Sequence, residues 1–170
     1  MTGEQRLVGR HKRLAFMKTG TGEESIYSRL SGFTAMSEGK EAKEYSRQYV
    51  DEATERTDVV GYATGIEYSF DRFTNNPAHE KIAQITDDEI VGPDAQVEVV
   101  TVDIFEEDAQ GNCPARKRNY SIVPETTGDG TDALIYSGVF KAASEIVKGY
   151  CKTTDNWQTC TFTEGSAPTA

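Results

Sequence analysis

Histidine and cysteine are scarce in this 170-residue chain, and their scarcity removes most catalytic schemes. The two histidines are His11 and His79, and no pair of cysteines stands at CxxC spacing. Zinc sites and nucleophile–base pairs are built largely from these residue types, so neither is predicted. His79 adjoins Glu80 without a partner at zinc spacing, which predicts a surface histidine. The odd number of cysteines predicts free thiols in a protein made in the cytosol: Cys113, Cys151 and Cys160.

Long apolar runs and nucleotide-binding motifs are also missing. No apolar stretch approaches the roughly 20 residues that a membrane-spanning helix requires. Residues 1–13 are polar and basic, so no secretory signal is expected. Gly20-Thr21-Gly22 lacks the third glycine of a dinucleotide-binding loop, no Walker lysine follows, and residues 103–112 lack calcium-loop spacing. We therefore expect no cofactor, no metal and no enzymatic activity.

Positive charge is absent from residues 82–115, and the whole chain carries 28 acids against 18 bases, a net charge of −10. Residues 61–112 hold twelve acids and two bases, whereas residues 1–18 hold five bases and one acid. The negative balance argues against a tight grip on nucleic acid or on an anionic membrane. A basic arm beside an acidic middle suggests self-association as readily as it suggests a foreign partner. The alternative is a solvated acidic face with a disordered tail.

What the sequence does contain is two-residue periodicity, which predicts a mainly β fold. Strands are expected at residues 14–18, 26–33, 66–70, 97–105, 119–123, 133–140 and 158–163. Gly128-Asp129-Gly130 accepts the positive φ of a turn, so the two strands around it should form a hairpin. The apolar set of 97–105 changes parity at Val99–Val100, which predicts either a bulge or a strand covered on both faces.

One helix is predicted over about residues 77–88. Asn76 suits the N-cap and Pro77 the first helical position, where its missing N–H costs nothing. One apolar stripe at helical spacing follows: Ala78, Ile82 and Ile85. Gly92-Pro93 prevents continuation. Three turns are enough to cover one face of a sheet.

A long hairpin is predicted over residues 31–58, where the alternation of Tyr45, Arg47 and Tyr49 with the residues between them indicates an extended chain. Its tip is expected at about residues 36–43, projecting from the body. Long loops in compact domains are usually functional or disordered, so this tip is a candidate functional segment. The expected organisation is a flexible basic arm at 1–13, a single domain at 14–163 and a flexible tail at 164–170.

An ordered series of segments runs through nearly the whole chain, from about Lys12 to Phe162. The segments are YSRLSGFT (27–34), EYSRQYVDE (44–52), TDVVGY (57–62), IEYSFD (66–71), NPAHE (76–80), DDE (87–89), TDA (131–133), YSG (136–138) and DNW (155–157). This series resembles the major tail protein, or tail tube protein, of long-tailed phages of Gram-positive bacteria. No single segment is a catalytic signature, and it is their order that is specific.

The resemblance implies a β-sandwich or small barrel with a flanking helix, in subunits that form hexameric rings. The rings stack into a hollow tube that conducts DNA to the host. Implied partners are other copies of the chain, tail completion proteins, baseplate or tip proteins, and the tape measure protein. The implied location is the virion tail, assembled in the bacterial cytoplasm, without a membrane. Tubes of contractile tails and of type VI secretion share this fold, so a contractile tail or a related injection machine is an alternative.

Three groups of residues are expected to serve such a tube. The arm should contact a neighbouring subunit through Arg6, Arg10, Lys12 and Arg13. The hairpin tip should contact the next ring through Ser37, Glu38, Lys40, Glu41 and Lys43. An acidic lumen, which repels DNA and lets it slide, should contain Glu67 and Asp71, with Glu98 and Asp103. The competing interpretations are that these acids only keep the outer wall soluble, or that the chain is a monomeric ligand-binding β-sandwich module.

Overall fold

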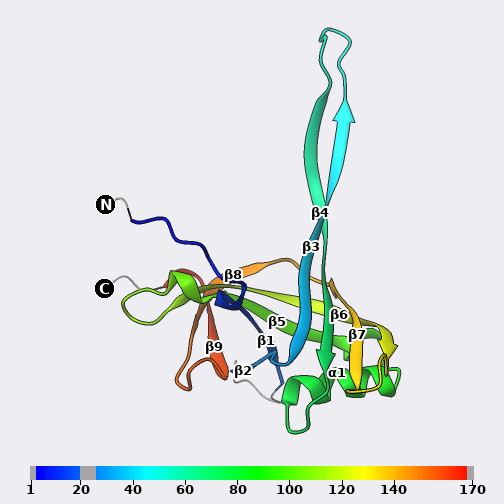
Figure 1. Ribbon diagram of the computed structural model, residues 1–170. Helices are drawn as coiled ribbons and strands as arrows, with labels where there is room; N and C mark the ends of the chain where they lie inside the picture. Colours follow the sequence, from blue (N-terminus) through cyan, green and yellow to red (C-terminus); the bar gives the residue numbers. More distant parts are fainter. Residues whose placement is uncertain (1–2, 20–25, 168–170) are drawn as a thin grey trace.

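The computed structural model describes residues 3–19 and 26–167, and within these residues it contains nine strands and one α-helix. In chain order they are β1 (Arg13–Lys18), β2 (Ile26–Arg29), β3 (Phe33–Arg47), β4 (Arg56–Asp71), α1 (Pro77–Asp87), β5 (Gln96–Asp103), β6 (Cys113–Thr127), β7 (Ile135–Ala142), β8 (Val147–Lys152) and β9 (Thr159–Glu164). Short 3-10 turns lie at η1 (Arg10–Lys12), η2 (Gly92–Ala95) and η3 (Ile104–Glu106). The predicted mainly β fold is confirmed (Figure 1).

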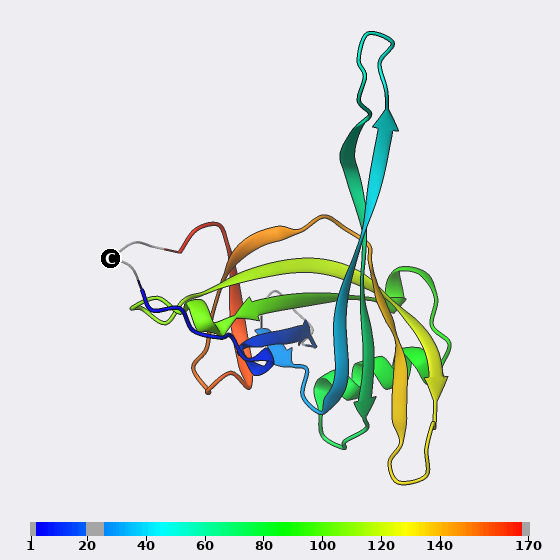
Figure 2. The same cartoon turned by 45° about the horizontal axis from the view of Figure 1, so that its top comes forward.

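All strand pairs are antiparallel, in the order β3-β4-β7-β6-β5-β1-β2-β9-β8. β8 also pairs with β6, so the six strands from β6 to β8 close into a small barrel. β6 is long enough to serve two neighbours, pairing with β8 at Cys113–Lys117 and with β7 at Tyr120–Thr127. β7, β4 and β3 therefore extend from the barrel as an open flap, covered by α1 (Figure 2). The expected small barrel with one flanking helix is thus observed.

Two hydrophobic cores share β5. The barrel interior holds Leu14, Phe16, Tyr27, Val100, Val102, Cys113, Ala115, Cys151, Cys160 and Phe162. The core between the flap and α1 includes Met17, Ile66, Tyr68, Phe70, Ile82, Ile85, Val97, Val99, Tyr120, Ile122, Tyr136 and Phe140. β5 pairs with β6 without a register shift across Val99 and Val100. The parity change therefore marks a strand covered on both faces, and no bulge is present there.

Helix α1 begins as predicted. The Asn76 side chain accepts the backbone N–H of His79 at 3.2 Å, and Pro77 opens the helix. His79, however, is fully buried, so the prediction of a surface histidine is wrong. The turn between β2 and β3 covers this side of the helix. The ring donates Nε2–H to the Ser31 carbonyl at 2.6 Å and accepts the Phe73 backbone N–H at Nδ1, so His79 ties α1 to two loops.

The hairpin consists of β3 and β4, paired from Phe33–Phe70 to Arg47–Arg56. Residues 48–55 form its tip, so the prediction of a tip at residues 36–43 is wrong: those residues belong to β3. The pairing of β4 with β7 ends at Gly65, and beyond it the two strands project as a ribbon (Figure 1). Tyr45 and Arg47 do lie in an extended strand, because β3 continues to Arg47. The second strand of the ribbon, β4, begins at Arg56.

Candidate assembly surfaces

The projecting part of the hairpin exposes apolar and aromatic side chains. Six of them are at least 47% exposed: Tyr45, Tyr49, Val50, Val59, Val60 and Tyr62. The Arg47 guanidinium lies over the rings of Tyr45 and Tyr49, 5.0 and 5.6 Å from their centroids. Arg56 forms an ion pair with Glu52 at 2.6 Å. Such exposed contacts add little stability, but they hold aromatic side chains in place on an element without a core.

The residues predicted for ring stacking lie where the hairpin leaves the flap. They belong to the part of β3 that pairs with residues 61–67 of β4, which we call the stem. Ser37, Lys40, Glu41 and Lys43 are exposed there. Glu38 instead turns toward the body, where it accepts a hydrogen bond from Arg13 at 2.9 Å. Glu38 therefore contacts the body of its own subunit, whereas the four exposed side chains are accessible to another molecule at the base of the hairpin.

The basic arm predicted at residues 1–13 has two parts: residues 3–8, before η1, are exposed, whereas Arg10 and Arg13 bond to the body. Arg6 is exposed and makes only a surface ion pair with Glu4 at 3.5 Å. Arg10 belongs to the body, because it donates to the backbone carbonyls of Arg13 and Met36 at 2.8 and 3.0 Å. Lys12 is exposed in η1. Arg13 is the first residue of β1 and pairs with the buried Asp103 at 2.7 Å, so a truncation that removes it leaves that carboxylate with Arg116 alone, at 3.6 Å.

The four acids predicted for the lumen do not lie together. Glu67 and Asp71 share the face of β4 that points away from α1, since the alternate residues of this strand fill the core. Glu98 lies near Lys18 at 3.8 Å and accepts a hydrogen bond from Tyr27. Asp103 is 5% exposed and forms ion pairs with Arg13 and Arg116, so its prediction as a water-facing residue is wrong. Glu67 and Asp71 remain as candidates for an acidic wall.

The face that carries Glu67 and Asp71 also carries small and polar side chains, together with the apolar Val139 and Ile135. In register across the flap, Ser37 pairs with Glu67 and Glu67 with Val139. The next row joins Ala35, Ser69 and Ser137. Glu67 is exposed on this face and Asp71 is partly exposed, so Glu67 has the freer access to water.

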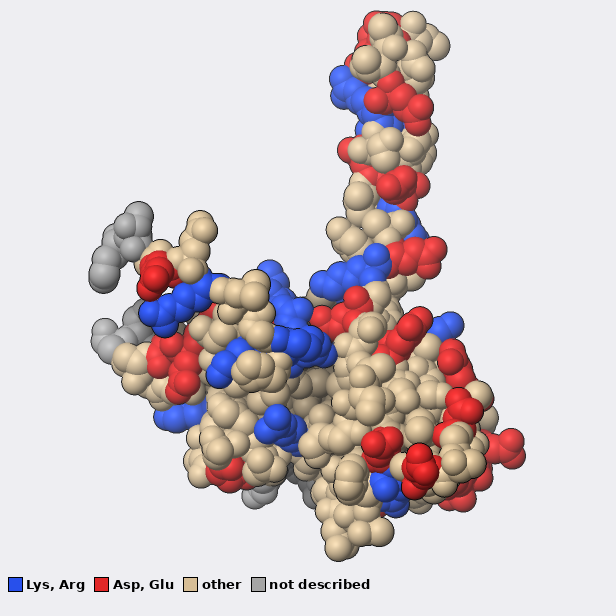
Figure 3. Space-filling view, viewed as in Figure 1, with Lys and Arg blue, Asp and Glu red and all other residues tan. Residues whose placement is uncertain are grey.

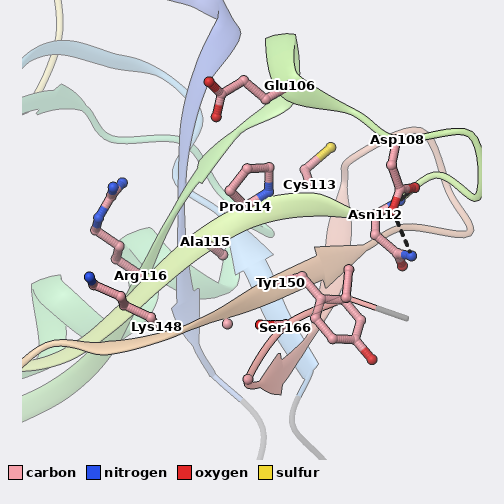
Figure 4. A pocket seen from close by; sticks show the side chains of 13 residues that line it. Glu106, Asp108, Asn112, Cys113, Pro114, Ala115, Arg116, Lys148, Tyr150 and Ser166 are labelled. Atoms are coloured by element: carbon pink, nitrogen blue, oxygen red, sulfur yellow. Dashed lines mark hydrogen bonds between the residues drawn. The ribbon is translucent and has the colours of Figure 1, made fainter. Parts of the chain in front are cut away.

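A depression of about 560 Å³ lies at one end of the barrel, beside β6 and β8 (Figure 4). Its polar residues include Asp108, whose carboxylate accepts the backbone N–H groups of Gln110 and Asn112 and thereby has a lowered pKa. This carboxylate organises its own loop. Cys113 lines the depression, but burial raises the pKa of its thiol to about 11, so it is protonated and a poor nucleophile at neutral pH.

The three cysteines are buried in the barrel and free, as predicted. Cys113 stands opposite Cys151 on paired strands, and a contact with Cys160 together with burial raises the pKa of Cys151. Across residues 3–19 and 26–167, no cluster of three or more His, Cys, Asp or Glu side chains is placed to hold a metal ion. In that same portion of the chain, no helix is long and apolar enough to cross a membrane.

Comparison with known proteins places the fold. No protein-family model matches the chain, and no curated protein matches it. Among solved structures, a chain of the anti-feeding prophage (AFP) baseplate, determined by cryo-electron microscopy with six-fold symmetrisation, matches with a TM-score of 0.50. The match covers 85% of this chain and 97% of that chain at 8% sequence identity. The protein therefore shares the fold of a baseplate chain from a phage-type particle.

Proposed function

We propose that this protein is a structural, non-enzymatic subunit of a phage-type tail that assembles into hexameric rings stacked as a hollow tube. This is the role of the major tail protein of long-tailed phages of Gram-positive bacteria, which the sequence resembles. The observation that carries the proposal is the hairpin, because a ribbon that buries nothing in its own subunit but presents fixed aromatic side chains needs a partner. The shared fold with a chain of a six-fold symmetrised baseplate supports it.

Strand edges give a second reason for self-assembly. Within the described chain the barrel closes on itself, but β3 ends the sheet with an outer edge that no described strand covers. This edge continues along the projecting ribbon, because β3 is one of its two strands, and it is unlike the closed barrel on the other side of the subunit. Contacts between unlike surfaces close into rings or repeat along an axis. Arg6 and Lys12 of the basic arm would contact a neighbouring subunit in the same assembly.

The lumen would be lined by the flap face that carries Glu67 and Asp71. DNA bears about one charge per 1.7 Å of axis, so an acidic wall keeps it from binding and lets it pass. DNA would then move through without tight binding, and tail completion, tape measure and tip proteins would be the other partners. In this proposal the protein resides in the virion tail, after assembly in the host cytoplasm.

A second candidate is a ring near the baseplate, because the matching structure is a baseplate. Negative-stain microscopy of the purified protein separates the possibilities. Stacked tubes support the proposed function, whereas single rings of fixed height favour the baseplate position. A chain that stays at 18.7 kDa on a sizing column at all concentrations supports the monomeric ligand-binding module and contradicts the proposal.

A further inference from the structure

The face of the sheet that packs against α1 has two unlike halves. Along β6, Tyr120 and Ile122 contribute to the core under α1, whereas Arg116 and Arg118 stand on the same face beyond that core. Along β5, Val99 is in that core and Thr101 is beyond it. The uncovered half lies at the base of the hairpin, where β3 and β4 leave the sheet.

This uncovered half forms a cleft of about 180 Å³ between the strands, the stem of the hairpin and Ile146. Four basic side chains line it, and we call it the cationic cleft: Arg13, Lys40, Arg116 and Arg118. Two acids face them, Glu38 and the buried Asp103, and both pair with Arg13. Bases thus exceed acids by two. Figure 3 shows basic side chains gathered around the base of the hairpin.

Two of the four bases are not neutralised within the subunit. In the part of the chain that the structure describes, neither Lys40 nor Arg118 takes part in an ion pair. The Nε atom of Arg118 is buried and has no hydrogen-bond acceptor. A buried donor without an acceptor is unfavourable, and a guanidinium binds carboxylates with two parallel hydrogen bonds. The cleft therefore has the chemistry of a carboxylate-binding site.

The same chain carries the matching carboxylates at the end of α1. Asp88 and Glu89 directly follow α1 and Asp94 lies in η2; all three are exposed, and no Lys or Arg occurs between residues 82 and 115. Acids at a helix C-terminus oppose the helix dipole, so this placement does not stabilise the subunit itself. The other acids near the cleft are already engaged, since Glu38 and Asp103 are ion-paired.

We propose that the cationic cleft of one subunit binds the acidic end of α1, at Asp88, Glu89 and Asp94, of a second copy. The inference rests on the proposed self-assembly and names one of its contacts. The cleft lies at the hairpin base and α1 at the opposite end of the flap (Figures 1 and 2). If two copies do not make this contact reciprocally about a two-fold axis, it is head-to-tail and propagates as a ring or a stack.

Charge reversal in two matched pairs tests the contact. One variant carries Lys40→Glu with Arg118→Glu, a second carries Asp88→Lys with Glu89→Lys, and a third combines all four substitutions. We expect each two-residue reversal to weaken assembly at least tenfold by sedimentation velocity, and the combined variant to recover most of it. Arg118→Gln is a milder variant, and thermal unfolding of each monomer shows whether the fold is kept. Reversals outside the contact serve as controls and should leave assembly unchanged: Lys148→Glu and Asp132→Lys.

The outcomes separate this inference from the proposed function. If the wild type forms rings or tubes and both folded reversals do so equally well, the docking is wrong while self-assembly stands. If the combined variant is no better than the two-residue variants, the two surfaces do not meet each other and the inference is also overturned. A wild type that remains monomeric overturns both.

Discussion

The hairpin strands have a lower part that belongs to the flap and an upper part that projects as the ribbon, and the two parts differ in how much of their side chains is buried. In the lower part of β4, Ile66, Tyr68 and Phe70 are buried against α1 and the flap. In the upper part of the same strand, Val59 and Tyr62 are more than half exposed, although the pairing with β3 continues along the ribbon, with one register shift between Lys43 and Glu44. Backbone pairing alone therefore makes a strand, whereas its stability comes from the surface that it buries. The body should therefore determine folding, and the ribbon should determine assembly.

The largest effect on folding is expected from Phe70→Ala. Phe70 is fully buried, and its ring lies 4.4 Å from that of His79 and 5.5 Å from that of Tyr136. The substitution should lower the free energy of unfolding by about 3–5 kcal/mol, since the cavity lies in a closed core. Tyr62→Ala, in the exposed length of the same strand, should change it by less than about 0.5 kcal/mol. Urea denaturation of the monomers measures both, and similar losses would contradict the comparison.

A smaller, pH-dependent effect is expected at His79. Burial lowers the pKa of His79 below its ordinary value of 6.5. Because the unfolded chain then binds the proton first, the contribution of neutral His79 is complete above pH 6.5 and is lost as the pH falls through the folded-state pKa. Stability measured by urea denaturation should therefore fall as the pH is lowered below 6.5.

Variants at the two histidines identify the source of that slope. His79→Ala should remove it and cost about 1–3 kcal/mol at pH 7.5, because the Ser31 carbonyl and Phe73 N–H lose their partner. His11→Ala, in an exposed position, should leave the slope unchanged. A slope that persists in His79→Ala would assign the titration to another group. The lowered pKa values of Asp108 and Asp155 place their effects below pH 4, outside this window.

The N-cap of α1 should have a smaller effect still. Asn76 accepts the His79 backbone N–H and donates to the Ser31 hydroxyl at 3.0 Å, so Asn76→Ala should cost about 1 kcal/mol of unfolding free energy. Asn76→Ser keeps a capping oxygen and should cost less. Calorimetry of the two variants checks the order, which would be reversed if the side chain strained the turn.

Local signals in the sequence were sufficient for local structure. The cap at Asn76, the stripe of α1 and the turn at Gly128-Asp129-Gly130 were predictable because each depends on neighbouring residues. β8 carried no such signal, since Gly149 and Tyr150 break the apolar alternation, and it forms because β6 and β9 pair with it. Whether β5 was bulged or covered twice also depended on distant strands.

The surfaces were harder to predict for the same reason. Asp103 looked like one of many exposed acids, but the pairing of β5 with β1 places it opposite Arg13. The cationic cleft had one usable signal: Arg116 and Arg118 alternate in phase with Tyr120, which places basic and apolar residues on one face. Only the fold shows that α1 covers one part of that face and leaves the other open.

The smallest effect on folding, and the largest on assembly, is expected from shortening the hairpin. Ala42 pairs with Tyr62, so replacing residues 43–61 by Asn-Gly joins the strands through a two-residue turn of the kind that hairpins prefer. The free energy of unfolding should change by less than about 0.5 kcal/mol, because the removed length buries no core and its exposed ion pairs add little. Rings or tubes should no longer form in negative stain. The full-length variant Tyr45→Ala with Tyr49→Ala separates the length of the ribbon from its aromatic contacts. If the shortened chain assembles like the wild type, the ribbon is not an assembly element, and its exposed aromatic residues serve another partner.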